Sequence, residues 1–402
     1  MIRDILILGK PREIFSLEIL NPEDILDLYK KYDKDFIYNI QGQFCIQIIF
    51  EDNRSLIFTD KLGFYPTFLD IRKGSICNNI EISNINENFI EESESYNDIS
   101  YQSIINKDIF SNIINNLEII RKLKSCMFFD TIDTNYKLLK PNSIYTIDRN
   151  SYDRADYEDQ EYNSKSSPSS RLLYIINKRY KENSLIELSF GYDTRLILAC
   201  LLKLGLKFKY ISYGEEKLLV KKYLSQIIKD ATIEEISEEL ILKDTENIVK
   251  SHLYSTNGFG DPFYKAHNYY CTDNFYEKCG LLISGGGLNE FYNMYKDKMN
   301  FLLESIRFNT GVGHHIKYVL SKCNALYIYA DLIFLSSIRN ENKNKDEIIK
   351  ELTSEIYPTL VNVPYFNDII KPNEIFSHFR SEKFSFNTRK KYLNMLKEEQ
   401  SL

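Results

Sequence analysis

The chain has 402 residues, of which 43% are hydrophobic, and a formal charge of −6 at pH 7. This length and hydrophobic content predict two domains with substantial cores, and the acidic balance argues against a general nucleic-acid surface. No apolar run approaches the ~20 residues needed to cross a bilayer, and the apolar part of the start MIRDILILGK is too short for a signal peptide, so we expect a cytoplasmic protein without membrane contact.

Residues 1–156 are expected to form a first domain rich in β-strands. Two runs with strand character, residues 36–50 and 55–68, are joined by a polar turn, and a further strand pair is expected at 138–150. The polar tract 157–171 combines charges with Ser and Pro, which is typical of an interdomain linker. Residues 172–402 then form the second domain.

A compact turn joins a short β-rich run, residues 185–188, to an apolar helical stretch that begins at Arg195. The turn consists of Ser189, Phe190, Gly191, Tyr192, Asp193 and Thr194. A glycine permits close backbone approach, hydroxyls donate, and the free amides at a helix start favour an anion, so this turn can cradle phosphate. Asp193 would repel phosphate unless a divalent cation lay between them, which indicates a magnesium nucleotide. The alternative is that Asp193 or Thr194 simply caps the helix.

The segment that follows has the alternation of an α/β domain. Residues 207–216 are predicted to form a second buried strand that ends in a glycine turn, and residues 217–228 have helical spacing. Strands that alternate with helices of this length predict a parallel, doubly wound sheet, with its ligand at the carboxyl ends of the strands.

A second glycine turn, residues 285–287, follows a short strand predicted at 281–284. Three consecutive glycines have a large entropic cost and usually mark backbone that passes close to another group, although a flexible surface turn is the alternative. Asn289 and Glu290 follow directly and could face the same pocket as Asp193.

The turn at 189–194 resembles the Ser-Gly-Gly-x-Asp-Ser pyrophosphate-binding turn of the asparagine synthetase family, within the N-type ATP pyrophosphatases. Here Phe190 replaces the first glycine and Thr194 the last serine. The segment LLISGGGLNEFYNMY, residues 281–295, is similar to the family's Ser-Gly-x-Gly-x-Asp-Glu element. The resemblance implies that ATP contacts both turns and the end of the second strand, at Ser189, Phe190, Gly191, Tyr192, Asp193, Thr194, Ser212, Gly214, Ser284, Gly285, Gly286 and Gly287.

The same resemblance implies a Mg²⁺ site and a catalytic lysine. The metal ligands would be Asp193 and Asn289. The family has an aspartate at the position of Asn289, and the uncharged amide that replaces it weakens a site for a hard cation. Residues 341–365 resemble the family's C-terminal segment, in which a lysine precedes a helix and a proline follows it. Lys345 is the candidate for that lysine and Lys343 the alternative, and a lysine that reaches the phosphates would stabilise charge as pyrophosphate leaves. A solvated lysine before an amphipathic helix is the competing interpretation.

The first domain resembles the smaller glutaminase-like (Ntn-type) α+β domain that precedes the synthetase domain in this family. The likeness rests on residues 42–44, on residues 60–66 and on the strand pair at 138–150. Glutamine-using members have a cysteine directly after the initiator methionine, whereas this chain begins Met1-Ile2-Arg3, and Cys45 lies inside a strand pattern. We therefore expect a degenerate domain without glutamine hydrolysis, as in β-lactam synthetases and lasso-peptide cyclases.

The implied function is ATP-dependent, AMP-forming amide-bond synthesis by a carbon–nitrogen ligase of specialised-metabolite or modified-peptide biosynthesis. A carboxylate attacks the α-phosphorus of ATP, and an amine then attacks the acyl-adenylate, with Glu290 orienting the amine or taking its proton. The expected partners are a small-molecule or peptide carboxylate and an amine acceptor, and a second copy of the chain is a candidate partner. An ammonia-dependent asparagine synthetase or sugar amidotransferase and a nucleotide-binding pseudoenzyme are the alternatives.

Seven cysteines, odd in number and without a Cys-x-x-Cys pair, predict neither a disulfide framework nor a structural zinc site. The histidine pair at 314–315 has no carboxylate at metal-ligand spacing, so no metal site is expected there. The chemistry that the sequence predicts therefore rests on the two turns and on the lysine at 345.

Overall fold

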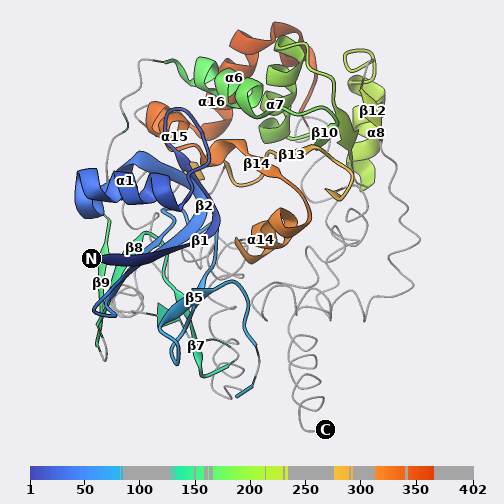
Figure 1. Cartoon of the computed structure of the whole chain (residues 1–402). Helices are drawn as coiled ribbons and strands as arrows, with labels where there is room; N and C mark the ends of the chain where they lie inside the picture. The colour runs from blue at the N-terminus through green and yellow to red at the C-terminus, as the bar shows by residue number, and fades with distance from the viewer. Residues whose placement is uncertain are drawn as a thin grey trace, which may run out of the picture.

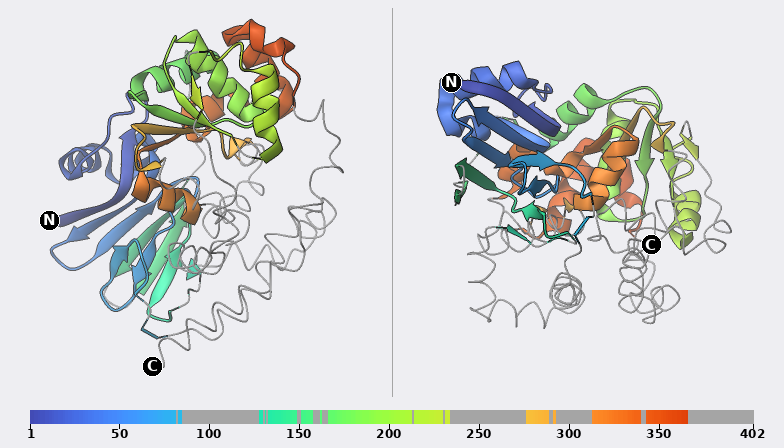
Figure 2. Two further views of the ribbon diagram at one scale, coloured as in Figure 1. Left: turned by 90° about the vertical axis from the view of Figure 1, so that its right-hand side faces the viewer. Right: turned by 60° about the horizontal axis from the view of Figure 1, so that its bottom comes forward.

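A computed structural model of the chain describes residues 1–81, 83–84, 128–129, 131, 133–148, 151–157, 162, 166–212, 214–229, 231–233, 276–288, 291–292, 313–339 and 343–365. In this part of the chain, a β-rich N-terminal half lies beside an α/β C-terminal half (Figure 1; Figure 2). The first half contains antiparallel sheets and the second a parallel sheet, so the fold is mixed α/β.

Two antiparallel sheets make up the N-terminal half. The first has the order β1-β2-β3-β8-β9, and its strands are β1 (Ile2–Glu13), β2 (Ile40–Phe50), β3 (Ser55–Thr59), β8 (Ser143–Asp148) and β9 (Ser151–Asp156). The second has the order β5-β4-β7-β6, and its strands are β4 (Phe68–Asp70), β5 (Ser75–Cys77), β6 (Phe128–Phe129) and β7 (Tyr136–Leu139). The run predicted at 36–50 is a strand only from Ile40, because the residues before it form a 3₁₀ helix.

The first sheet packs on both faces. On one face, Cys45 and Ile57 form a core with Leu69 and Leu139 of the second sheet. On the other face, a second core joins the sheet to α1 (Pro22–Tyr32) and η1 (Asp33–Asn39). Strand β2 is therefore buried on both sides, which explains the apolar run from Phe44 to Phe50, interrupted only by Gln47.

Every strand pair in the C-terminal sheet is parallel. Its order is β12-β11-β10-β13-β14, and its strands are β10 (Ser184–Glu187), β11 (Lys209–Ile211), β12 (Thr232–Ile233), β13 (Leu281–Ser284) and β14 (Ala325–Tyr327). The first strand, β10, is central: the chain extends from it to β12 and then returns to add β13 and β14 on its other side. The direction of strand addition thus reverses between β10 and β13.

Helices accompany these strands, and α6, α7 and α16 lie together beside the sheet (Figure 1). Their bounds are α6 (Pro168–Arg179), α7 (Tyr192–Lys203), α8 (Gly214–Tyr223), α14 (Gly313–Lys322), η4 (Ile328–Ala330), α15 (Leu332–Arg339), α16 (Lys345–Ile356) and η5 (Pro358–Asn362). Ser167 caps α6 through the amide of Ser170, so the helix begins inside the linker expected at 157–171, and residues 168–171 are helical instead. None of the helices in the described residues is long and apolar enough to cross a membrane.

The two halves share a hydrophobic core. Leu62 and Phe64 of the N-terminal half belong to the same buried cluster as the strands and helices of the parallel sheet. The Phe64 ring lies 4.8 Å from the ring of Phe291 and 5.5 Å from that of Tyr327, between centroids. The joint between the halves is therefore a packed interior rather than a contact between two finished surfaces.

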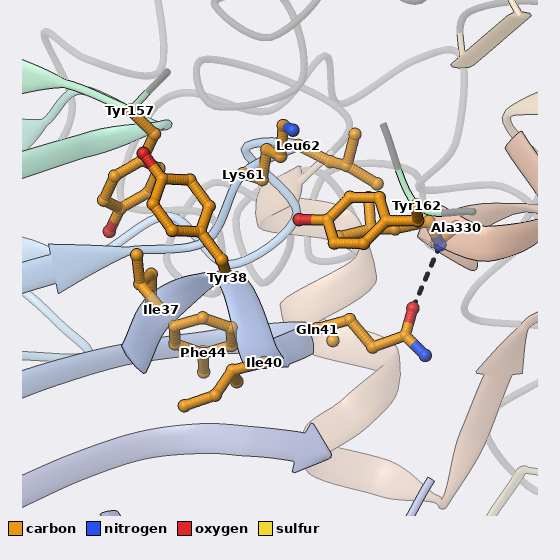
Figure 3. Close-up of a pocket in the computed structure, with 12 residues that line it drawn as sticks. Ile37, Tyr38, Ile40, Gln41, Phe44, Lys61, Leu62, Tyr157, Tyr162 and Ala330 are labelled. Carbon is orange, nitrogen blue, oxygen red and sulfur yellow. Dashed lines mark hydrogen bonds between the residues drawn. The ribbon is translucent and has the colours of Figure 1, made fainter. Parts of the chain in front are cut away.

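A buried polar network crosses the same joint. Arg171 of α6 donates to both carboxylate oxygens of Asp331, at 3.0 and 2.7 Å, and also to the carbonyl of Ile14 at 2.8 Å. Gln41 of β2 donates to Asp331 Oδ2 at 3.0 Å and accepts from the amide of Leu332 at 3.0 Å. Figure 3 shows this last bond beside a pocket lined by residues from both halves.

Candidate functional site

Two turns meet at the carboxyl ends of the central strands. Residues 188–191 connect β10 to α7, and residues 285–287 follow β13. Strand addition reverses between β10 and β13, and parallel α/β sheets commonly bind ligands at the carboxyl ends of the strands beside such a reversal.

The first turn is closed by its own hydroxyl groups. Thr194 Oγ1 donates to the carbonyl of Ser189 at 2.8 Å and lies 2.9 Å from Ser189 Oγ, which accepts from the amide of Gly191 at 3.3 Å. Gly191 is the N-cap of α7, and no side chain caps this helix. The capping role considered for Asp193 and Thr194 is therefore wrong, and the first amides of α7 have no side-chain acceptor at the cap.

Two aromatic rings of the turn pack against other side chains. Phe190 is fully buried, with the Arg195 guanidinium 4.8 Å from its ring centroid. Only its backbone can therefore contact a ligand, and the bulk that replaces a glycine in the motif lies in the core. The ring of Tyr192 stacks on that of Tyr365, with centroids 4.0 Å apart, and Lys350 Nζ lies 5.3 Å from its centroid.

The second turn touches the first. A Cβ added to Gly285 would lie 3.0 Å from Thr194 Cγ2 and 3.2 Å from its amide nitrogen, so the glycine allows the two turns to approach. Gly287 has a φ of 95°, and a Cβ there would lie 2.5 Å from the Phe291 ring. The glycines thus serve a close, specific contact, which argues against a flexible surface turn.

Glu187, a carboxylate that was not predicted from the sequence, is linked to the second turn through Ser284. Glu187, the last residue of β10, accepts hydrogen bonds from Tyr276 at 2.5 Å and from Ser284 Oγ at 3.3 Å. Ser284 Oγ also accepts from the amide of Gly286 at 3.2 Å. Glu187 thereby orients the hydroxyl that holds the glycine turn. The signal available in the sequence was a charged residue inside an otherwise apolar strand.

Lys345 reaches the first turn from α16. Its Nζ lies 3.2 Å from Asp193 Oδ1, and the two side chains are 15% and 25% exposed, so a ligand can reach the pair. Lys343 instead pairs with Glu351 at 2.6 Å, at the surface. Of the two lysines considered, the structure brings Lys345 to the site.

Two further residues that the sequence reasoning missed fix α7 and its turn. Tyr329 in η4 donates to the carbonyl of Asp193, and burial raises the pKa of Tyr329, which keeps it a donor. Arg195 is fully buried and donates to the carbonyls of Val363 at 2.8 Å and Pro364 at 2.9 Å. Arg195 therefore ties the start of α7 to the segment that follows α16. An arginine within an apolar helix was the signal that could have indicated this role.

Ser212 and Gly214 follow β11, next to the first turn. The amide of Leu188 donates to the carbonyl of Ile211 at 2.8 Å, which places Ser212 beside the start of the turn. Ser212 is 4% exposed, and its Oγ has no hydrogen-bond partner among the described residues. A buried, unpaired hydroxyl at a candidate ligand site fits a group that the protein does not itself supply. Gly214 begins α8.

Asn289 and Glu290, the second metal ligand and the residue expected to act on the amine, lie outside the described residues. Within the described ranges, no group of three or more His, Cys, Asp and Glu side chains is placed to hold a metal ion. The structure therefore places one of the two expected metal ligands, Asp193, and shows it paired with a lysine.

Comparison with protein-family models gives no match for this sequence, and comparison with curated proteins gives none either.

Proposed function

We propose that this protein is an ATP-dependent, AMP-forming carbon–nitrogen ligase of the asparagine synthetase type. On this proposal, the parallel sheet is a doubly wound synthetase domain and the antiparallel half a degenerate glutaminase-like domain of the Ntn type. The activated group is a small-molecule or peptide carboxylate, and the acceptor is an amine.

One observation carries the proposal. Two turns that resemble the family's paired elements, about ninety residues apart, touch at Thr194 and Gly285, and Lys345 reaches the same place. Each of the three elements has an ordinary alternative explanation: a helix cap, a surface turn or a solvated lysine. These explanations do not account for the meeting of all three elements where the strand order reverses.

The described residues fit a nucleotide triphosphate. The start of α7, which no side chain caps, can receive an anion in the manner of phosphate-binding helix starts. The unpaired Ser212 hydroxyl is available as a further donor. Bound Mg²⁺ would neutralise phosphate charge, with Asp193 as its ligand from the described residues.

The roles of this chain's own groups follow. The turn holds the phosphates so that a carboxylate can attack the α-phosphorus, and Lys345 stabilises the charge that develops as pyrophosphate leaves. Asp193, paired with Lys345, orients that ammonium group before substrate binds. The amine then attacks the acyl carbon, and Glu290 is the residue proposed to take its proton.

The replacement of the first glycine by Phe190 does not count against the proposal, because this side chain is buried in the core. Glutamine hydrolysis remains outside the proposal. Cys45 is fully buried, and burial raises the pKa of its thiol, so it is unsuited to act as a nucleophile.

The decisive experiment is the binding of MgATP to the full chain, followed by pyrophosphate release with a panel of carboxylates. Calorimetry is suited to the first step, because the chain has no tryptophan to report binding. We expect binding in wild type and weaker binding in Asp193→Ala. Absence of MgATP binding in correctly folded wild type would reject the ligase and the nucleotide-binding pseudoenzyme together.

A further inference from the structure

Four basic side chains lie where the end of β1 meets the end of α6. Lys10 and Arg12 are two positions apart on β1, so their side chains leave the same face of the strand. Arg179 is the last residue of α6, and Lys181 follows two positions later. These four residues, here called the basic cluster, come from both halves of the protein.

Direct contacts bring the two ends together. Arg12 Nη1 donates to the carbonyl of Leu17 at 2.9 Å. The next residue, Glu18, pairs with Lys178 at 2.6 Å, and Lys178 immediately precedes Arg179 at the end of α6. Arg12 and Arg179 therefore lie next to the same short contact, between the loop after β1 and the last turn of α6.

Lys10 and Lys181 extend the cluster along the amino ends of the parallel strands. Lys10 Nζ donates to Asn324 Oδ1 at 2.6 Å, directly before β14. Lys181 precedes β10, and its Cβ lies 3.4 Å from the position of a Cβ added to Gly280, directly before β13. Because β10, β13 and β14 are neighbours in the sheet, both lysines lie at the edge opposite the candidate site.

Within the described residues, the basic cluster has no carboxylate partner. The ion pairs in that part of the chain include none of its four members. Glu18, the acidic residue beside Arg12, is paired with Lys178 instead. Arg12 is only 9% exposed, and a buried charge is normally paired with an opposite charge. The cluster therefore has the electrostatics of a site for an anion.

The pKa values of the cluster agree with this arrangement of charges. Burial and the charge of Arg179 lower the pKa of Arg12 to about 10, and burial lowers the pKa of Arg179 to about 10. Burial, followed by the charges of the other three members, lowers the pKa of Lys10. A bound anion would offset the repulsion between these groups.

The chemistry of the cluster matches a compact phosphate group. A guanidinium group presents its N–H donors in a planar fork that fits two phosphate oxygens, and an ammonium group adds a point charge. The cluster contains two groups of each kind. An extended nucleic acid fits less well, because three of the four side chains are buried or half-buried and the whole chain has a formal charge of −6.

We propose that the basic cluster of Lys10, Arg12, Arg179 and Lys181 binds a small anion that carries a phosphate or diphosphate group. The site is separate from the candidate nucleotide site, because it lies at the amino ends of the strands. A bound anion contacts β1 and the end of α6, so it should stabilise the joint between the two halves. This inference does not rest on the proposed function.

The experiment titrates the full wild-type chain with inorganic pyrophosphate, without magnesium, in a calorimeter. Sodium chloride of the same ionic strength is the control. We expect binding that weakens as salt is added, and a pyrophosphate-dependent rise in the thermal midpoint of unfolding. Absence of binding beyond the chloride control would overturn the proposal, and so would binding of a short single-stranded RNA without binding of pyrophosphate.

A matched pair of variants locates the binding. Arg179→Gln should weaken pyrophosphate binding by about tenfold or more, since a hydrogen bond to a charged group contributes at least that much. Lys178→Gln removes the neighbouring cation, which already pairs with Glu18, and its affinity should stay within about twofold of wild type. Equal affinity in wild type and Arg179→Gln would overturn the proposal. Titration with MgATP reports on the candidate nucleotide site, so the two proposals can fail independently.

A measurement without ligand tests whether Arg179 has only a structural role. Arg179→Met retains most of the apolar stem and removes a charge that repels Arg12. In phosphate-free buffer, its thermal midpoint should equal or exceed that of wild type, and pyrophosphate should no longer raise it. A midpoint below that of wild type would show that Arg179 stabilises the protein by itself, which contradicts a site that needs an anion.

Discussion

Lys345 and Asp193 are in contact although 152 positions separate them in the sequence: the lysine Nζ lies 3.2 Å from the aspartate Oδ1. The pair joins the start of α16 to the start of α7, two helices that pack against each other. An ammonium group beside Asp193 offsets the charge that would otherwise repel a phosphate. The contact therefore leaves the first turn without a net negative charge from Asp193.

Replacement of this lysine tests the proposed chemistry. Lys345→Met should lower the rate of pyrophosphate release by about 10²-fold or more, since loss of one donor to developing charge typically has an effect of that size. Lys343→Met is the matched control, because that lysine pairs with Glu351 at the surface, and its rate should stay within about twofold of wild type. Equal losses in the two variants would remove the assigned role of Lys345.

A methyl group at position 285 tests the contact between the turns. Gly285→Ala places a Cβ 3.0 Å from Thr194 Cγ2, so the turns must separate, at a cost of about 1–3 kcal/mol in stability. MgATP affinity measured by calorimetry should fall with it. In Gly286→Ala the nearest atom is Ser284 Oγ at 3.4 Å, an ordinary contact, so this variant should lose less stability than Gly285→Ala. If Gly285→Ala bound MgATP with unchanged affinity, the contact between the two turns would not be needed for nucleotide binding.

The buried ion pair across the joint should be costly to break. Arg171→Met leaves Asp331 buried and deprived of its cation, which should lower the free energy of unfolding in urea by about 3–5 kcal/mol. Lys178 lies on the same helix and also reaches the N-terminal half, through an exposed pair with Glu18 at 2.6 Å. Lys178→Met should cost at most about 1 kcal/mol. Similar costs for both variants would mean that burial does not set the strength of the contact.

Lys317 should make stability depend on pH in the alkaline range. Its Nζ donates to the carbonyls of Pro66 and Asn78, and desolvation lowers its pKa to about 7 from 10.5. Between these values the unfolded chain binds one more proton than the folded chain at this site, so the free energy of unfolding rises with pH, by at most about 1.4 kcal/mol per unit.

The control for this prediction is Lys317→Met, which removes the titrating group. The unfolding free energy of wild type minus that of the variant should increase as the pH rises from 7 to 10, because other titrating groups cancel in the difference. If the unfolding free energies of wild type and variant changed equally with pH, the pKa of Lys317 would be the same in the folded and unfolded chains.

Local sequence patterns predicted the elements that form the site but not their supports. The β10–α7 turn, the glycine turn after β13 and the lysine before α16 each have a recognisable sequence, because turns and helix starts are specified by neighbouring residues. Glu187, Tyr329 and Arg195 escaped prediction, because their partners lie far along the chain and only the folded structure brings them together. The strand order likewise depends on pairing between distant segments.

The start of the helix α6 was predicted too late in the sequence. The tract before the second domain has the Ser and Pro of a linker, yet Pro168 follows the capping residue Ser167 and suits the first turn of a helix. The direction of the Phe190 side chain could not be predicted from the sequence. The sequence shows that Phe190 stands where the family has a glycine, but the direction of its ring depends on the core around Arg195 and Tyr223.

The shared interior at the joint determines how this protein can be dissected. A cut near residue 160 would leave Leu62 and Phe64 on one fragment and their packing partners on the other. Each fragment would then expose an apolar surface that normally never meets water, and both should aggregate when expressed alone. Domain exchange with another protein would have to keep β2, the loop at 60–66 and α15 together, because the shared core and the contact of Gln41 with Asp331 join them.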